Sequence, residues 1–328
     1  MAVQTQITDW IMAAADDLDL RIVNLGWTER WAPGIQAIAA TITLGDCAFT
    51  GHGADEDLDT AVVKAVVEAL ERATKAESAL PTTSGLAGHV NADQAARNAL
   101  REFIERDAFF CHYLTGTPFR QLGDMTQLPT AAIDWQRLQG ISRTEGVELQ
   151  FASLTVPDGF HGVVCAAFGA DAARPFGVIL GLGCEQSTAQ AAQKAALECL
   201  GNVAAQLDGR LGPALSADSF KSLSKPWVFD HLHLGLDEES ASVMRRLFKP
   251  ADDYGRALHI EGVNIETMPS LRTTKDAPLH FARVTVRHGQ NAYFGKQSPE
   301  VLNLNRLGCF VGKTLAISDL EPHPHFLA

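Results

Sequence analysis

Several patterns that identify whole classes of proteins are missing from this 328-residue sequence. Its six cysteines are Cys47, Cys111, Cys165, Cys184, Cys199 and Cys309. No two of them form a Cys-x-x-Cys pair, so the sequence does not indicate a structural zinc site. No apolar stretch approaches the length of a membrane span, and residues 1–20 lack the basic start and long apolar core of a signal peptide. We therefore expect a cytoplasmic protein without a membrane partner, whose cysteines are reduced and mostly buried.

Two common nucleotide-binding patterns are also absent, namely a P-loop and a Gly-x-Gly-x-x-Gly sequence followed by a helix. Basic side chains are few, because 27 lysines and arginines stand against 39 aspartates and glutamates, which gives a formal net charge of −12. A nucleic-acid partner favours a basic surface, so this balance argues against one. The hydrophobic content of 46% and the charged content of 20% fit a soluble globular enzyme with an ample core.

A helical pattern is present twice between Ala61 and Phe110. The first copy, AVVKAVVEALERA, carries Lys64, Glu68, Glu71 and Arg72, and the second, ARNALREFIERDA, carries Asn98, Glu102, Glu105 and Arg106. Each residue of the second set lies 34 positions after its counterpart, and a glycine-bearing turn over residues 82–91 separates the copies. Because residues three and four apart share one face of a helix, each copy predicts a helix with a polar stripe beside an apolar face.

The two polar stripes allow a functional and an ordinary interpretation. If the helices pack side by side, four carboxylates converge, and such oxygens suit Mg²⁺, which takes carboxylate, water and phosphate ligands. The arginines would then hold phosphate oxygens through paired hydrogen bonds. In the ordinary interpretation, Glu68–Arg72 and Glu102–Arg106 are ion pairs that each stabilise an exposed helix by about 0.2–0.5 kcal/mol. The repetition in register favours the functional interpretation.

Residues 51–110 resemble the central segment of the YcaO family. In that family an Ala-Leu-x-Glu-x-x-Glu-Arg helix is followed by Ser-Asn-Gly-x-Ala-x-Gly and by a second Glu-x-x-Glu-Arg-Asp helix. The resemblance extends over about residues 35–328 and is specific only in residues 51–110. It implies that the paired helices bind ATP and Mg²⁺.

The resemblance also implies a role for each residue of the site. The metal ligands would be Glu68, Glu71, Glu102 and Glu105. The phosphate and nucleotide contacts would be Lys64, Arg72, Ser84, Arg106, Glu198, Asn202 and Arg283. Four positions depart from the family pattern, because His52 replaces a common lysine, Lys64 a serine, Gly85 an asparagine and Asn202 a glutamine. Lys64 has two interpretations, a phosphate ligand or a partner of Glu68.

The C-terminal sequence PHPHFLA is similar to the Pro-x-Pro-x-Pro tail of the azoline-forming branch of the family. In that branch the terminal carboxylate reaches the reaction centre, which implies that Ala328 acts as a general base. Here Phe326 stands in place of the third proline, and two residues follow it. Prolines fix an extended backbone and so can aim a tail, whereas the alternative is a disordered terminus.

The activity that the resemblance implies is ATP-dependent phosphorylation of a backbone amide in a ribosomally made precursor peptide. Attack by a Cys, Ser or Thr side chain gives an azoline ring, the product that the tail favours, and attack by a sulfide equivalent gives a thioamide. A third hypothesis is a scaffold that binds peptide or partner without nucleotide, because a fold does not guarantee a function. No precursor-recognition domain is evident, so we expect a separate partner protein to deliver the peptide. Homo-oligomer formation is left open.

Helix and strand patterns are mixed, with several consecutive strands, which predicts an α+β fold with helices packed on mixed or antiparallel sheets. We expect an N-terminal appendage over residues 1–33, whose helix continues to Leu18, and a catalytic domain over residues 34–328. A strand over residues 34–50 would end at the Gly-His-Gly of residues 51–53. His231 and His233 would lie on one side of a strand and could bind zinc there, although no further ligand is evident nearby.

Overall fold

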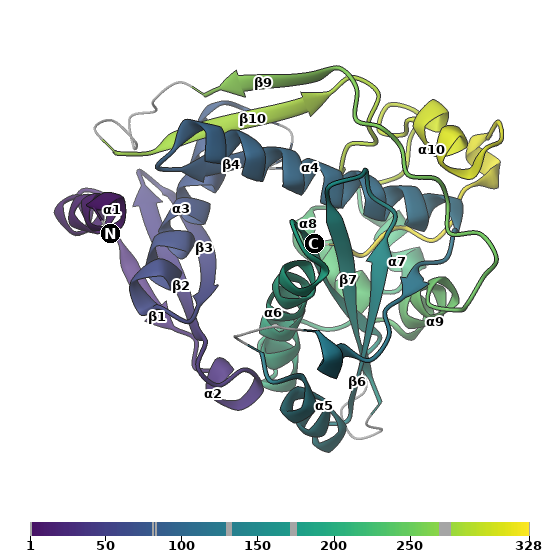
Figure 1. Cartoon of the computed structure of the whole chain (residues 1–328), viewed down its shortest axis with the longest axis horizontal. Coiled ribbons are helices and arrows are strands. Elements are labelled where there is room, and N and C mark those ends of the chain that lie inside the picture. The colour runs from purple at the N-terminus through teal and green to yellow at the C-terminus, as the bar shows by residue number, and fades with distance from the viewer. Residues whose placement is uncertain are drawn as a thin grey trace. The chain divides into compact units, whose positions relative to one another are not determined.

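The structure is a computed structural model that describes residues 2–80, 82, 84–128, 133–170, 176–268 and 277–327. The chain divides into two compact units. The first comprises Met1–Phe103 and Val263–Thr285, and the second comprises Ile104–Gly262 and Val286–Ala328. Both units combine helices with antiparallel sheets, which confirms the predicted α+β class (Figure 1).

The first unit begins with a three-stranded antiparallel sheet of order β1-β2-β3. The strands are β1 (Arg21–Asn24), β2 (Gln36–Leu44) and β3 (Cys47–Asp55). Helix α1 (Ala2–Ala14) precedes the first strand, and helix α2 (Thr28–Trp31) lies between the first two. The expectation that the first helix continues to Leu18 is wrong, because the chain turns after Ala14 and passes through Asp19 with a left-handed φ of +41°. β1 pairs with β2, and a separate appendage over residues 1–33 stays a prediction.

Helix α3 (Leu58–Glu77) packs across β3 and β2 (Figure 1). The expected strand end at Gly51 and Gly53 is wrong, since both glycines lie within β3. A Cβ atom at Gly51 would stand 2.2 Å from the carbonyl oxygen of Ala65, and one at Gly53 would stand 2.0 Å from that of Ala61. The glycines therefore let the helix backbone lie directly on the strand, as glycine does where two backbones approach closely.

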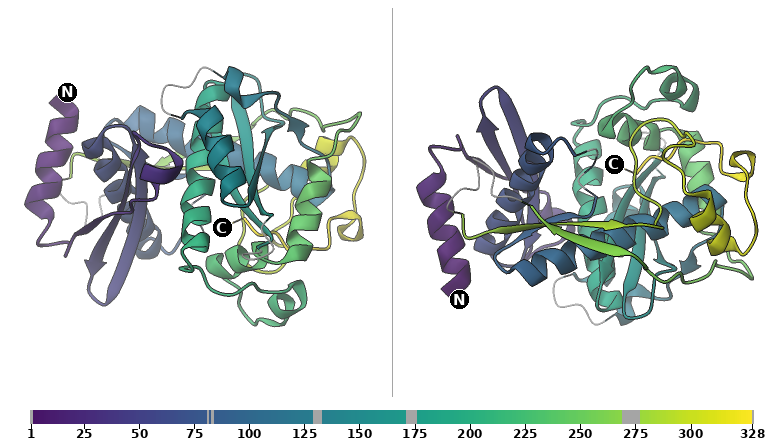
Figure 2. Two further views of the ribbon diagram at one scale, coloured as in Figure 1. Left: turned by 90° about the horizontal axis from the view of Figure 1, so that it is seen from below. Right: turned by 90° about the horizontal axis from the view of Figure 1, so that it is seen from above.

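The second sheet of the first unit has the order β4-β10-β9. Its strands are β4 (Leu86–His89), β9 (Val263–Thr267) and β10 (His280–Val286). β9 and β10 pair and run side by side as one ribbon (Figures 1 and 2). β4 lies within the turn predicted over residues 82–91, where Leu86 pairs with Arg283 of β10. Helix α4 (Ala92–Thr115) follows β4 and carries the chain from the first unit into the second.

The second unit is built around a four-stranded antiparallel sheet of order β5-β6-β7-β8. Its strands are β5 (Arg120–Gln121), β6 (Val147–Leu154), β7 (His161–Gly169) and β8 (Val178–Glu185). Its helices are α5 (Trp135–Thr144), α6 (Thr188–Leu207), α7 (Ala217–Ser222), α8 (Val228–Gly235), α9 (Glu238–Leu247) and α10 (Leu304–Val311), with short 3₁₀ turns η1 (Met125–Gln127) and η2 (Ile317–Asp319). α6 packs on β8 and β7 (Figure 1). The C-terminal half of α4 supplies Phe109, Phe110 and Tyr113 to the core of this unit.

The two histidines expected on a strand lie on helix α8 instead. The helix starts where the Asp230 carboxylate accepts a hydrogen bond from the backbone N–H of Trp227 at 2.9 Å, a local signal that favours a helix start over a strand. His231 is buried and contacts the C-terminal tail rather than His233, with its Nδ1 atom 2.6 Å from the carbonyl oxygen of His325. Within the described ranges, no group of three or more His, Cys, Asp or Glu side chains is gathered to hold a metal ion, so the zinc interpretation gains no support.

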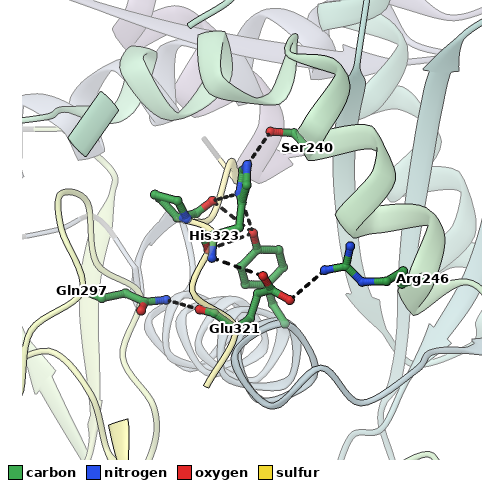
Figure 3. A network of polar contacts seen from close by, with 7 residues as sticks. Ser240, Arg246, Gln297, Glu321 and His323 are labelled. Carbon is green, nitrogen blue, oxygen red and sulfur yellow. Dashed lines mark hydrogen bonds and ion pairs between the residues drawn. The ribbon is translucent and has the colours of Figure 1, made fainter. Parts of the chain in front are cut away.

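The C-terminal tail packs into the core of the second unit, so the alternative of a disordered terminus is wrong for residues 323–327. Phe326 and Leu327 are each 3% exposed. The hydroxyl of Tyr113 donates hydrogen bonds to the carbonyl oxygens of His323 and Pro324 at 3.2 and 3.0 Å (Figure 3). Glu321 precedes this segment and pairs with Arg246 at 3.0 Å. Ala328, the predicted general base, lies outside the described residues.

Three further features bear on the expectations. Four cysteines are buried, and Cys47 and Cys309 are exposed. All six are free thiols. In the described part of the chain, no helix is long and apolar enough to cross a membrane.

Candidate functional site

The predicted site residues of the first unit centre on Glu68 and Glu71 of α3. Glu68 accepts a hydrogen bond from the backbone N–H of His52 at 2.5 Å and pairs with the Arg72 guanidinium at 2.8 Å, as the i,i+4 spacing predicts. Glu71 accepts a hydrogen bond from the backbone N–H of Gly88 at 2.6 Å. The carboxylates of α3 are thereby tied to β3 on one side and to β4 on the other, which fixes their positions.

The electrostatics of Glu71 show that the carboxylates of this unit crowd one another. Burial raises the pKa of Glu71 well above its usual value, and the nearby carboxylates of Glu102 and Glu68 raise it further. The Gly88 hydrogen bond and Arg72 oppose this rise without cancelling it. A raised pKa means that the ionised form of the carboxylate is unfavourable in these surroundings. A bound cation would therefore relieve the repulsion between the neighbouring carboxylates.

Three predicted site residues of the second unit form a cluster with one further residue, so that two carboxylates meet two cations. Glu105 on α4 is only 1% exposed, and its carboxylate lies 2.9 Å from the Lys194 ammonium of α6. The Arg106 guanidinium lies 3.7 Å from Glu105 and 3.6 Å from Glu198. Glu198 also accepts a hydrogen bond from the backbone N–H of Leu182 on β8 at 3.0 Å. Burial raises the pKa of Glu198, while Arg106 and Lys194 counteract that rise.

Lys194 is the member of this cluster that the sequence analysis missed. A signal for it was present, because Lys194 lies four residues before Glu198 on a predicted helix, and residues at that spacing are neighbours on one helix face. The partner that matters most, Glu105, lies 89 residues earlier in the chain. No local pattern connects residues so far apart.

The remaining predicted residues have various local partners. Lys64 pairs with Asp55 at 2.6 Å, which is not the Glu68 partner considered from the sequence. Ser84 donates its backbone N–H to the hydroxyl of Thr82, and Asn202 lies on α6 one turn beyond Glu198. The departure at Gly85 has a steric reason, because its φ is +74° and a Cβ there would stand 2.6 Å from the carbonyl oxygen of Val284.

The residues present fit Mg²⁺ in one specific way. A closed cage of three or more protein ligands is not formed within the described residues. Mg²⁺ does not require one, since it is usually bound by one or two carboxylates together with waters and substrate phosphates. The crowded pair Glu68 and Glu71, and the buried Glu105 flanked by cations, offer carboxylates of that kind. Arg72 and Arg106 stand beside them as candidates for phosphate oxygens.

The fold is that of an α+β protein with charged side chains on its helix faces, and sequence comparison gives the family. A family model described as YcaO cyclodehydratase, ATP- and Mg²⁺-binding, matches residues 70–311. The chain therefore belongs to the YcaO family. A comparison with curated protein sequences gives no match.

Solved structures agree on the fold. The structure of YcaO from Methanopyrus kandleri bound with AMPPCP and Mg²⁺ is 15% identical and superposes with a TM-score of 0.60, over 91% of this chain and 96% of that one. A heterocyclase in complex with substrate and cofactor is 12% identical with a TM-score of 0.65, over 98% of this chain. This chain spans 58% of the heterocyclase, so the larger protein contains segments without a counterpart here.

Proposed function

We propose that this protein uses ATP and Mg²⁺ to activate a backbone amide of a ribosomally made precursor peptide, with formation of an azoline ring from Cys, Ser or Thr. The observation that carries the proposal is the pair of Glu-x-x-Glu-Arg helices, in which Glu71 is crowded by the carboxylates of Glu68 and Glu102. Such an arrangement destabilises the metal-free state and favours a cation. Membership of a family described as an ATP- and Mg²⁺-binding cyclodehydratase supports the same activity.

The chemistry requires the amide oxygen to leave, and that oxygen is a poor leaving group. The side-chain nucleophile of the substrate adds to the carbonyl carbon, and the resulting oxyanion takes the γ-phosphoryl group of ATP. The addition closes the ring and releases the proton of the side-chain nucleophile, and the phosphoryl transfer leaves ADP. The C–O bond of the former amide then breaks with release of phosphate, the amide nitrogen loses its proton, and a C=N bond forms within the ring. The protein acts mainly by positioning the groups and neutralising charge, as in other phosphoryl transfers.

Each predicted residue has a proposed part in this reaction. Glu68, Glu71, Glu102 and Glu105 would hold Mg²⁺, which would offset the charge of the phosphates. Arg72, Arg106, Lys64 and Arg283 would contact phosphates, and Ser84, Glu198 and Asn202 would hold the rest of the nucleotide. The terminal carboxylate of Ala328 would accept a proton, and the anchored tail before it supports this role.

Thioamide formation is the second candidate, since it needs the same activation and differs only in the nucleophile. The proline-bearing tail, which is packed into the core up to Leu327, favours the azoline product. We also propose that a separate protein delivers the precursor. Product mass distinguishes the two reactions, because an azoline is lighter than the amide by one water whereas a thioamide exchanges oxygen for sulfur.

The test of nucleotide binding is calorimetric titration of Mg²⁺-ATP into the wild type and into Glu102→Ala. We expect the substitution to weaken binding by at least about tenfold, since a ligand to the metal is lost. Glu77→Ala, which removes an exposed carboxylate at the end of α3, is the matched control and should bind as the wild type does. Titration should be repeated with the partner protein present, and equal binding by wild type and Glu102→Ala in both series would contradict the assignment.

A further inference from the structure

The two units contain the same strand-turn-helix arrangement, built from sequences that lie 130 positions apart. In both, the residue between two glycines of a strand donates its backbone N–H to a glutamate 16 positions later on the following helix. The donors are His52 and Leu182, and the acceptors are Glu68 and Glu198. In both, the residue before the helix caps it, since Asp57 accepts a hydrogen bond from Thr60 N–H and Ser187 from Gln190 N–H.

The glycines have the same packing role in each copy. A Cβ at Gly181 would stand 2.1 Å from the carbonyl oxygen of Ala195, and one at Gly183 would stand 2.1 Å from that of Ala191, as Gly51 and Gly53 meet α3. Identical residues at this offset are Gly51/Gly181, Gly53/Gly183, Ala61/Ala191, Lys64/Lys194, Ala65/Ala195, Glu68/Glu198 and Leu70/Leu200. No insertion interrupts the match, so α3 and α6 can be compared position by position.

This comparison makes Lys194 the counterpart of Lys64, and the two lysines have different surroundings. Lys64 is 52% exposed and pairs with Asp55, a half-exposed residue of its own hairpin. Lys194 instead pairs with a carboxylate that is 1% exposed and belongs to a different element, α4. Lys194 itself is 43% exposed, so this ion pair joins a partly exposed ammonium group to a buried carboxylate. The shared framework thus places a partly exposed cation beside a buried predicted metal ligand in the second copy only.

We propose that Lys194 is a positioning residue that controls when a divalent cation reaches Glu105. Its ammonium group covers the buried Glu105 carboxylate and neutralises the charge of that carboxylate. The same ammonium group repels a free metal ion from the carboxylate oxygens. Phosphate groups that arrive with the metal offset this repulsion and offer Lys194 another partner. The metal therefore binds well only together with the nucleotide, and metal alone binds weakly. This inference rests on the proposed function, because it takes Glu105 as a metal ligand.

The physical basis is competition for one carboxylate. A Mg²⁺ ligand oxygen lies about 2.0–2.1 Å from the ion, so an ammonium already at hydrogen-bond distance must withdraw before the metal binds. Two cations about 4 Å apart repel each other near a protein surface, and the negative charge of phosphate oxygens offsets that repulsion. Removal of one partner from a buried ion pair leaves an uncompensated charge, which destabilises the fold until another cation replaces it.

The experiment uses Mn²⁺ alone and the Mg²⁺ complex of AMPPCP as probes on the full-length protein. Free Mn²⁺ binding is measured by electron paramagnetic resonance for the wild type, Lys194→Met, Lys194→Arg and the control Lys221→Met, whose side chain lies on the exposed face of α7. We expect Lys194→Met to bind free Mn²⁺ about tenfold or more tightly than the wild type. Lys194→Arg and Lys221→Met should match the wild type.

Thermal unfolding gives a second readout that a merely structural lysine would not produce. In chelator, Lys194→Met should melt several degrees below the wild type, and Mn²⁺ should restore most of that loss. Equal or weaker Mn²⁺ binding by Lys194→Met, or a melting loss that Mn²⁺ does not restore, overturns the inference. Mg²⁺-AMPPCP binding by the wild type tests the proposed function separately, so a protein that binds the complex but fails the Mn²⁺ comparison refutes only the role of Lys194.

Discussion

The carboxylate of Glu71 on α3 accepts a hydrogen bond of 2.6 Å from the backbone N–H of Gly88 on β4. This contact joins the first Glu-x-x-Glu-Arg helix to the glycine-bearing segment that follows it in the sequence. It also holds Glu71 among other carboxylates, where burial and charge raise its pKa. The consequences for stability can be measured without any activity assay.

Glu71→Gln should stabilise the metal-free protein at neutral pH. The pKa of Glu71 is raised in the folded state, so folding favours the protonated form, and stability falls as pH rises above the unfolded value of 4.5 toward the folded one. Glutamine keeps an oxygen for the Gly88 N–H and removes the charge. We expect a melting temperature a few degrees higher than that of the wild type at pH 8 in chelator, with a smaller difference at pH 4. A lower melting temperature of Glu71→Gln at pH 8 would show that burial and the neighbouring carboxylates do not destabilise the ionised Glu71 side chain.

Phe326→Ala should destabilise the second unit by about 3–5 kcal/mol, because a buried aromatic side chain is replaced by a cavity. Phe326 is 3% exposed and meets the Tyr113 ring edge to face, with centroids 5.6 Å apart. Urea unfolding measures the loss. Removal of Ala328 alone is the informative comparison, since it should leave stability close to that of the wild type while it reduces peptide modification. Equal losses of stability in both variants would contradict the proposed general-base role.

His231 should remain neutral down to about pH 4. Burial lowers its pKa to about 4, although the hydrogen bond to His325 and the charge of Asp230 oppose the change. The unfolded chain binds this proton near pH 6.5, so the stabilisation is present above that pH and is lost as pH falls from 6.5 toward 4. The shift corresponds to about 3 kcal/mol of stability. An NMR titration of the His231 ring protons checks this directly, and a midpoint near 6.5 would contradict the buried position.

Gly51→Ala and Gly181→Ala should each cost about 1–3 kcal/mol or more of stability, because the new methyl group meets helix backbone that cannot move aside. The added Cβ would stand 2.2 Å from the oxygen of Ala65 and 2.1 Å from that of Ala195. Gly140→Ala is the control, since a Cβ there meets nothing within 4 Å and the position lies in helix α5. The control should be neutral or slightly stabilising by helix propensity. If Gly51→Ala were equally harmless, the close packing of α3 on β3 would be wrong.

Local patterns were enough to predict the two helices that carry the Glu-x-x-Glu-Arg sequences. The i,i+3 and i,i+4 spacing of apolar and polar residues indicates α3 and α4. Short-range signals act within a few residues, and the capping side chains Asp57 and Ser187 show the same locality. The Glu68–Arg72 ion pair follows from the spacing alone. The Glu-x-x-Glu-Arg pattern indicates the family, and the family model that matches residues 70–311 confirms it.

Contacts between residues far apart in the chain required the folded structure. The position of the glycines within β3 depends on the backbone of α3, which a local sequence window does not contain. The contact of His231 with the carbonyl oxygen of His325, 94 positions later, is likewise invisible in a local window. The ion pair between Glu105 and Lys194 spans 89 positions, and the two copies of the strand-turn-helix arrangement lie 130 positions apart and share few identical residues. Periodicity and motifs in the sequence indicate helices, strands and the family. The partner of each charged side chain depends on which helices and strands pack together, and only the tertiary structure determines that packing.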